Sequence, residues 1–168
     1  MKKTAIVYGS SSGTTEGVAK LIAGKLGIPA NCVFDVSKFT TQQAEDFEVL
    51  ILGTSTWGDG ELQDDWYDGI NTLKSAKLSG KLIALFGCGD SSAYSSTFCD
   101  GMGQIYEDLQ GSGCNFIGEV STDGYSFDSS RAVVDGKFVG AALDEMNEPD
   151  QTDARLQAWI DSFKDKLQ

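Results

Sequence analysis

The sequence of 168 residues contains no histidine and few cations. The lack of histidine excludes Ser-His-Asp and Cys-His catalysis, imidazole metal ligands and histidine pH switches. Lysine and arginine total 13 against 25 aspartates and glutamates, which gives a net charge of −12. Nucleic acids and anionic membranes repel such a chain, so we expect neither as a partner and instead expect proteins with basic surfaces.

Cysteine pairs and long apolar runs are also absent. No Cys-x-x-Cys occurs, which argues against a zinc ribbon or an iron–sulfur cluster, so no metal is expected. No stretch has the roughly 20 apolar residues of a membrane helix, and the run Ala5–Tyr8 is too short for a secretory signal. We expect a cytoplasmic monomer. Its free, buried thiols would be Cys32, Cys88, Cys99 and Cys114.

The length fits a single domain over residues 1–168. Apolar runs typical of buried strands occupy Thr4–Tyr8, Asn31–Val36, Val49–Gly53, Lys81–Gly87 and Asn115–Val120. Stretches with helical spacing alternate with them at Thr14–Leu26, Thr41–Asp46, Asp65–Lys74, Thr97–Leu109 and Thr152–Leu167. This alternation predicts a doubly wound α/β fold, with a five-stranded parallel sheet covered by helices on both faces.

Two segments add detail to this prediction. The first expected helix places Val18, Leu21, Ile22 and Leu26 on one face. Residues 121–136 are rich in glycine, serine and aspartate and break the alternation before apolar residues resume at Phe138. We interpret this stretch as an insertion in the fifth strand.

The loop after the first predicted strand, Gly9–Thr15, reads Gly-Ser-Ser-Ser-Gly-Thr-Thr. It leads directly into a helix, whose N-terminal N–H groups and dipole attract an anion. The loop contains neither lysine nor arginine and lacks the Gly-Lys-Ser/Thr ending of a Walker loop. We expect it to bind a single phosphate group. The alternative is a tight strand–helix turn with a capping hydroxyl.

Two further loops follow predicted strands and carry an aromatic residue among small ones. The second loop, Thr54–Leu62, follows the third strand and holds Trp57 beside Gly58 and Gly60, which leave the backbone free to approach a ligand. The third loop, Gly87–Tyr94, follows the fourth strand and ends at Tyr94. Because ligands of open α/β sheets bind beyond the carboxyl ends of the strands, these loops together favour a mononucleotide with a flat ring.

With these loops the chain resembles long-chain flavodoxins. The matching segments are Gly9–Thr15, Thr56–Leu62, Gly87–Tyr94 and Thr122–Asp144, and the similarity covers Thr4–Leu167. The resemblance implies a flavodoxin-like strand order of 2-1-3-4-5 with the insertion in the fifth strand. It also implies non-covalently bound flavin mononucleotide (FMN). The protein would be a low-potential one-electron carrier that shuttles between semiquinone and hydroquinone, and not an enzyme.

The resemblance also assigns the site residues. The phosphate would be held by Ser10, Ser11, Ser12, Gly13, Thr14 and Thr15. The isoalloxazine ring would lie between Trp57 and Tyr94. The other cofactor-binding residues would be Thr56, Gly58, Asp59, Gly60, Cys88, Gly89, Asp90, Phe98, Cys99 and Asp100.

Other protein classes require motifs that this chain lacks. No tyrosine is followed four residues later by lysine, as in short-chain dehydrogenases, and no cysteine is followed six residues later by arginine, as in low-molecular-weight phosphatases. A response-regulator receiver needs acidic residues after the first strand, where this chain has Gly9 and serines. An FMN-dependent quinone reductase on the same fold stays as the alternative. We favour the carrier, because two aromatic plates would cover the ring on which a hydride donor must act.

Acidic residues crowd the second loop, and no lysine or arginine occurs between Lys38 and Lys74. This pattern supports a carrier that docks on basic redox proteins, such as reductases and low-potential oxidoreductases. Asp64 is also expected to cap the helix that begins at Asp65. The acidic residues are Asp59, Glu61, Asp64, Asp65 and Asp68.

Overall fold

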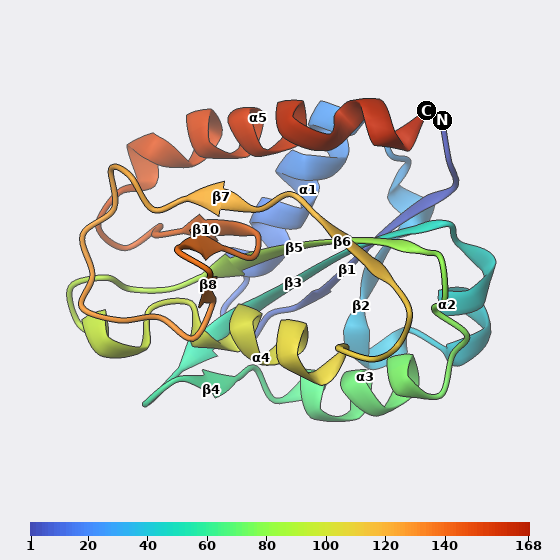
Figure 1. Ribbon diagram of the computed structural model, residues 1–168, viewed down its shortest axis with the longest axis horizontal. Coiled ribbons are helices and arrows are strands. Elements are labelled where there is room, and N and C mark those ends of the chain that lie inside the picture. Colours follow the sequence, from blue (N-terminus) through green and yellow to red (C-terminus); the bar gives the residue numbers. More distant parts are fainter.

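The computed structural model describes residues 1–168 and contains a central parallel sheet with helices on both faces (Figure 1). The strands β2, β1, β3 and β5 lie side by side in that order and are all parallel. This confirms the expected order of the first four strands. Their bounds are Thr4–Gly9 for β1, Val33–Asp35 for β2, Val49–Trp57 for β3 and Leu82–Cys88 for β5.

Two short strands share the remaining edge of β5. The strand β6 (Asn115–Ile117) pairs with the beginning of β5, and β10 (Ala141–Leu143) pairs with its end. The expected strand Asn115–Val120 is therefore shorter in the structure, and it ends before Gly118, whose φ of +84° suits glycine. Residues 118–140 connect β6 to β10 and contain an antiparallel sheet of β7 (Val120–Ser121), β9 (Lys137–Phe138) and β8 (Val133–Val134).

The helices form one layer on each face of the sheet (Figure 1). The helices α1 (Thr14–Leu26) and α5 (Thr152–Phe163) cover one face. The other face is covered by α2 (Thr41–Asp46), α3 (Asp65–Lys74) and α4 (Asp100–Asp108). The first three helices have the bounds expected from the sequence. The helix α4 begins later than expected, because Phe98 is extended and Cys99 is left-handed with φ +55°. The last helix, α5, ends earlier than expected, and a 3₁₀ turn follows it at Lys164–Leu167. None of the helices has the length and apolar character needed to cross a membrane.

Alternate residues of the central strands pack into two separate cores. On β3, Leu50 and Leu52 face α3 and α4, while Val49 and Ile51 face α1 and α5, and all four are fully buried. Each such side chain contributes about 1.5–3 kcal/mol by leaving water. Burial on both faces explains why the strands are continuously apolar.

Two sequence expectations about helix surfaces were wrong. Leu21 is 48% exposed, because α1 contacts the sheet through a narrower stripe that includes Val18 and Ile22. Asp64 does not cap α3, since its own backbone is helical (φ −51°, ψ −43°) and its side chain accepts no hydrogen bond from the helix. The Oε1 of Gln63 instead accepts a hydrogen bond from the Asp65 N–H at 3.0 Å.

The close contact between α4 and the segment at Arg131 leads to a stability prediction. A Cβ at Gly103 would lie 2.5 Å from the carbonyl carbon of Arg131, whereas a Cβ at the exposed Gly24 of α1 would meet nothing within 4 Å. We expect Gly103→Ala to lower the free energy of unfolding by about 1–3 kcal/mol through overpacking. Gly24→Ala should raise it by about 0.5–1 kcal/mol through helix propensity. Urea denaturation of both variants measures these changes, and equal effects would contradict the prediction.

Candidate functional site

The strands β1, β3, β5 and β10 end next to one another at a single edge of the sheet. Gly9 lies beside Thr54, and Cys88 has Ser55 on one side and Leu143 on the other. The segments that follow these strands therefore meet, and they enclose a cavity of about 210 Å³. This is the position at which open α/β sheets bind their ligands.

Many residues predicted from the sequence line this cavity. They are Ser12, Thr14, Thr56, Trp57, Gly58, Cys88, Gly89, Asp90 and Tyr94. The sequence reasoning missed Ser55, Glu145 and Met146. Glu145 and Met146 directly follow β10, which pairs with the end of β5. The sequence does not reveal this pairing, because residues 118–140 separate β10 from β6 along the chain.

The first loop presents an open helix N-terminus. Gly13, at the N-cap of α1, has φ +93°, and no side chain caps the helix. The Ser10 hydroxyl oxygen accepts a hydrogen bond from the Gly13 N–H at 3.0 Å, which closes the loop. The Thr15 hydroxyl is fully buried in the first turn of α1 and has no hydrogen-bond partner in the protein. A buried hydroxyl without a partner is costly, so this group suits an anion bound at the helix N-terminus.

Two large aromatic side chains stand exposed at the mouth of the same cavity. Trp57 is 44% exposed and Tyr94 is 46% exposed, although both carry extensive apolar surface. The indole N–H of Trp57 donates to the Ser55 hydroxyl at 2.9 Å, which fixes the orientation of the ring. Exposed aromatic faces beside a cavity favour stacking of a planar ligand.

Phe98 and Cys99 lie outside the cavity and support it from the core. Both are buried, and the Phe98 ring packs against Phe127 with centroids 5.6 Å apart. The Cys99 thiol lies 3.7 Å from the carbonyl oxygen of Gly87. Cys99 therefore packs against the end of β5, and both side chains lie close to Gly89, which follows that strand.

Asp59, Gly60 and Asp100 also lie outside the cavity lining. A Cβ at Gly60, where φ is +95°, would come within 2.6 Å of Asp100 Oδ2, so the second loop packs closely on the start of α4. The carboxylate of Asp100 accepts a hydrogen bond from the Arg131 N–H at 2.7 Å. Burial raises the pKa of Asp100. Asp59 is exposed to solvent.

The Cys88 thiol lines the cavity and is buried. Burial raises its pKa to about 12. Burial likewise raises the pKa of the neighbouring Cys99 thiol well above its usual value. Because the thiolate is the reactive form, burial disfavours nucleophilic chemistry at both groups. Cys32 and Cys114 are free and only partly buried, less than the sequence led us to expect.

Gln63 links the first two loops and was not identified from the sequence. Its side chain is 2% exposed, and its Nε2 donates to the Ser11 hydroxyl at 3.2 Å and to Asp65 Oδ2 at 3.0 Å. With the bond from the Asp65 N–H to Oε1, the amide holds the first loop against the start of α3. Nothing in the local sequence distinguishes this glutamine from an exposed one.

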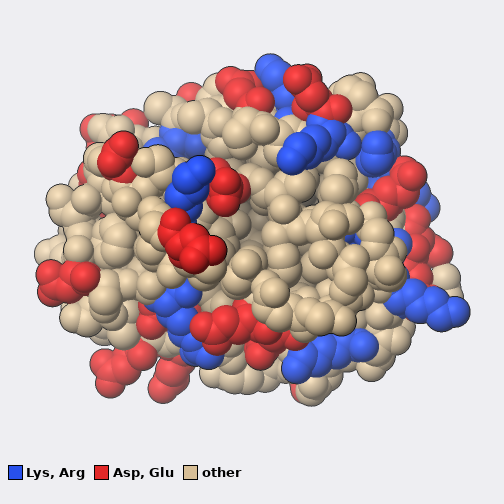
Figure 2. Space-filling view, viewed as in Figure 1, with Lys and Arg blue, Asp and Glu red and all other residues tan.

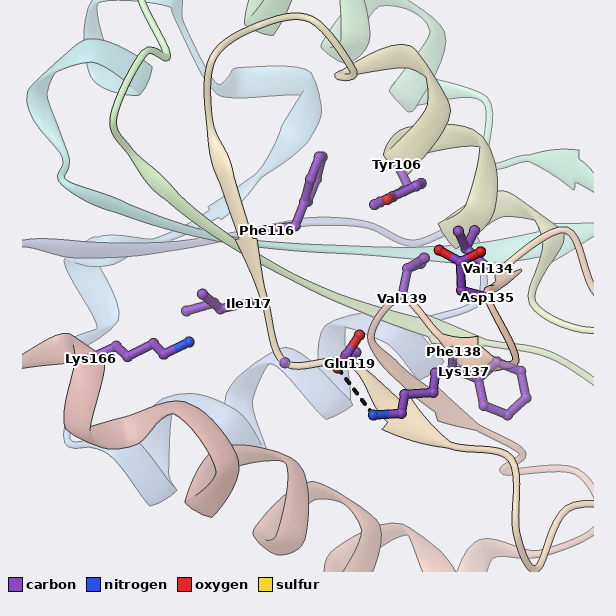
Figure 3. Close-up of a pocket in the computed structure, with 11 residues that line it drawn as sticks. Tyr106, Phe116, Ile117, Glu119, Val134, Asp135, Lys137, Phe138, Val139 and Lys166 are labelled. Atoms are coloured by element: carbon purple, nitrogen blue, oxygen red, sulfur yellow. Dashed lines mark hydrogen bonds and ion pairs between the residues drawn. The ribbon is translucent and has the colours of Figure 1, made fainter.

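A second cavity, of about 360 Å³, lies apart from these loops between α4, β6 and the β8–β9 turn (Figure 3). Tyr106 and Phe116 face each other there, with ring centroids 4.6 Å apart. Lys137 forms an ion pair with Glu119 at 3.2 Å on its other side. It shares no lining residue with the first cavity and contains none of the residues predicted to bind a cofactor.

The fold and the first cavity define a doubly wound α/β protein with a ligand site beyond the ends of its strands. The sequence matches the flavodoxin family over residues 6–159. It is 44% identical over 161 residues to the flavodoxin of Buchnera aphidicola from Acyrthosiphon pisum, covering 95% of this chain and 94% of that protein. It is 39% identical over 168 residues to flavodoxin 1 of Escherichia coli K12, covering 99% and 96%.

Solved structures agree with the sequence relatives. The crystal structure of Fusobacterium nucleatum flavodoxin bound to flavin mononucleotide superposes with a TM-score of 0.90 at 32% identity, and the match covers 100% of both chains. The K13G mutant of that protein, also bound to flavin mononucleotide, gives a TM-score of 0.92 at 33% identity. The chain belongs to the flavodoxin family.

The buried amide of Gln63 leads to a second stability prediction. In Gln63→Leu the Asp65 N–H and the Ser11 hydroxyl lose their partner. We therefore expect the free energy of unfolding to fall by about 1–3 kcal/mol. The matched control is Gln42→Leu, because Gln42 is exposed on α2 and bonds only Asp46. Urea denaturation of both variants gives the difference, and a Gln63 variant as stable as the control would refute this role.

Proposed function

We propose that this chain binds FMN in the cavity at the strand ends and acts as a low-potential one-electron carrier. The observation that carries the proposal is an uncapped helix N-terminus whose Ser12 and Thr14 line the same cavity as two exposed aromatic rings. In the first turn of the same helix the Thr15 hydroxyl is buried without a hydrogen-bond partner. One end of the site thus suits a phosphate and the other a flat ring. The F. nucleatum structures with flavin mononucleotide support this assignment.

The first loop would hold the phosphate without a cation. Backbone N–H groups and hydroxyls would supply the hydrogen bonds, as is common at helix N-termini. The residues proposed for this role are Ser10, Ser11, Ser12, Gly13, Thr14 and Thr15. Because Ser10 and Ser11 already hold Gly13 and Gln63, their main effect would be to shape the loop.

Trp57 and Tyr94 would hold the ring between them, with the backbone of the second and third loops along its edges. When bound, the flavin supplies the capacity to accept and release single electrons. The protein would exclude water from the ring faces and set the electrostatic environment. We assign the ring edges to Thr56, Gly58, Cys88, Gly89 and Asp90, which line the cavity. Asp59, Gly60 and Asp100 lie just outside that lining, and we assign them to the outer part of the same edges. Phe98 and Cys99 would act only as support from behind.

The charge around the site supports docking to basic redox proteins. The short strand β4 (Glu61–Leu62) pairs antiparallel with the end of β3. The exposed acidic residues Asp59, Glu61 and Asp64 lie around the turn between these strands and the start of α3. Figure 2 shows acidic side chains projecting at the edge of the molecule in this region. A negative rim attracts a basic partner and raises the rate of encounter at low salt.

An enzymatic function has less support than a carrier function. The relatives are flavodoxins, which are electron-transfer proteins and not enzymes. No feature of the cavity favours a quinone reductase over this assignment. The four free thiols support a reducing compartment, so we place the protein in the cytoplasm. We also propose that it acts as a monomer.

The phosphate assignment predicts a specific effect of Thr15→Val. Valine keeps the shape of threonine but removes the hydroxyl, and a hydrogen bond to a charged group is worth about 1.5–3 kcal/mol. We expect the Kd for FMN to rise at least about tenfold. The Kd for riboflavin, which lacks the phosphate, should stay the same. Quenching of flavin fluorescence on titration with the apoprotein measures both constants.

The control for this experiment is Thr41→Val. Thr41 is likewise a threonine at a helix start, but that helix is α2. Its hydroxyl donates to the Thr72 carbonyl at 3.2 Å. Its substitution should leave both dissociation constants unchanged. If the parent protein binds riboflavin as tightly as FMN, the first loop is not a phosphate site.

The acidic rim predicts a shift in redox potential. A negative charge about 10 Å from the ring makes the addition of one electron to the ring less favourable by about 0.4 kcal/mol in water, equivalent to about 17 mV. We therefore expect the triple variant Asp59→Asn, Glu61→Gln and Asp64→Asn to raise the lower of the two one-electron midpoint potentials by tens of millivolts. Potentiometric titration at low ionic strength measures it.

A second triple variant controls for the loss of charge alone. Asp123, Asp135 and Asp165 are exposed and form no ion pair, and none of them lines the cavity at the strand ends. Their replacement by asparagine should shift the potential much less. Equal shifts in the two triple variants would show that only the net charge matters.

A further inference from the structure

Asp144, directly after β10, is a buried carboxyl group without a cationic partner. It is 0% exposed and forms no ion pair with lysine or arginine. Its oxygens instead accept hydrogen bonds from the Ser91 N–H at 3.1 Å, the Ser91 hydroxyl and the Asn147 N–H at 3.0 Å. Because a buried carboxyl is costly unless such bonds are made, Asp144 ties the third loop to the segment after β10.

Asn147 extends this connection to a second carboxylate. Its Nδ2 donates to Asp144 at 3.0 and 3.1 Å and to Asp90 Oδ1 at 2.8 Å. The same Asp90 oxygen accepts from the N–H groups of Ser92 and Ala93 at 3.1 and 2.9 Å. One side-chain amide therefore bridges two carboxyl groups on different segments.

The bridge determines where a pocket-lining aromatic residue lies. The turn that Asp90 organises continues into Tyr94, whose N–H donates to the Asp90 carbonyl at 2.9 Å. Hydrogen bonds, first from Ala93 and then from Asn147, lower the pKa of Asp90. On the other side of the bridge, Met146 is 73% exposed and lines the same cavity.

We propose that Asn147 and Asp144 are positioning residues for the flavin ring: together they form a clip that fixes the Tyr94 loop against the Glu145–Met146 segment. The side chains of Asp90, Asp144 and Asn147 form no hydrogen bond with the first loop, so we expect the clip to act on the ring end of the site. This inference rests on the proposed function, because it requires a flavin in the cavity.

The clip is tested with Asn147→Asp, which replaces two N–H donors by an oxygen facing two carboxyl groups. We expect the Kd for FMN to rise at least about tenfold and the Kd for riboflavin to rise by the same factor. The ratio of the two constants should stay constant because the phosphate loop is untouched. The circular dichroism of the bound flavin in the visible region should also change as Tyr94 moves. The matched control is Asn31→Asp, an identical charge change at an exposed position after α1.

A second variant, Asn147→Ala, removes the donors without adding charge and covers the case in which Asn147→Asp does not fold. It should raise both constants at least about threefold. A role limited to stability would lower the melting temperature of the apoprotein and leave the constants at 25 °C unchanged, because the folded apoprotein stays fully populated. Unchanged constants in the folded variants, or a rise for FMN alone, overturn the clip. Failure of the parent protein to bind FMN overturns the proposed function itself.

Discussion

The parallel pairing of β1, β3 and β5 is the constraint on which the rest of the molecule depends. Parallel strands all end at the same edge of the sheet, so the segments that follow them converge whatever their sequences. Burial of both faces fixes the register, because a shift by one residue would exchange the two cores. The sheet thus supplies most of the apolar burial, and the loops at its edge can carry serine, glycine and exposed aromatic residues.

Polar groups in the site are held mainly by other neutral groups and by backbone N–H donors. The first loop contains no cation, and Asp144 is buried without one. Hydrogen bonds of this kind have fixed directions and depend less on salt than ion pairs do. The surface around the site carries exposed acidic side chains instead. In the proposed function, the cofactor and the partner would thus be recognised by different kinds of interaction.

The sequence predicted the elements that depend on local patterns. The bounds of α1, α2 and α3 and the loops that hold Trp57 and Tyr94 follow from apolar spacing and from small residues after strands. Contacts between distant segments were not predictable in this way. Gln63 accepts from the Asp65 N–H in place of the expected Asp64 cap, and a tertiary bond to Ser11 holds its amide there. Met146 reaches the cavity only because β10 pairs with the end of β5.

The strands β6 and β10 share one edge of β5, and this affects the order in which the chain can fold. The strand β6 follows β5 after one helix, whereas β10 returns to the same strand only after residues 118–140 have been placed. Closing the longer loop costs more chain entropy, and only the three residues of β10 form the strand pairing that offsets this cost. All three residues of β10 are buried, and they belong to the cores on both faces of the sheet. Because Glu145 and Met146 directly follow this strand, the cavity is complete only once the longest connection in the sheet has closed.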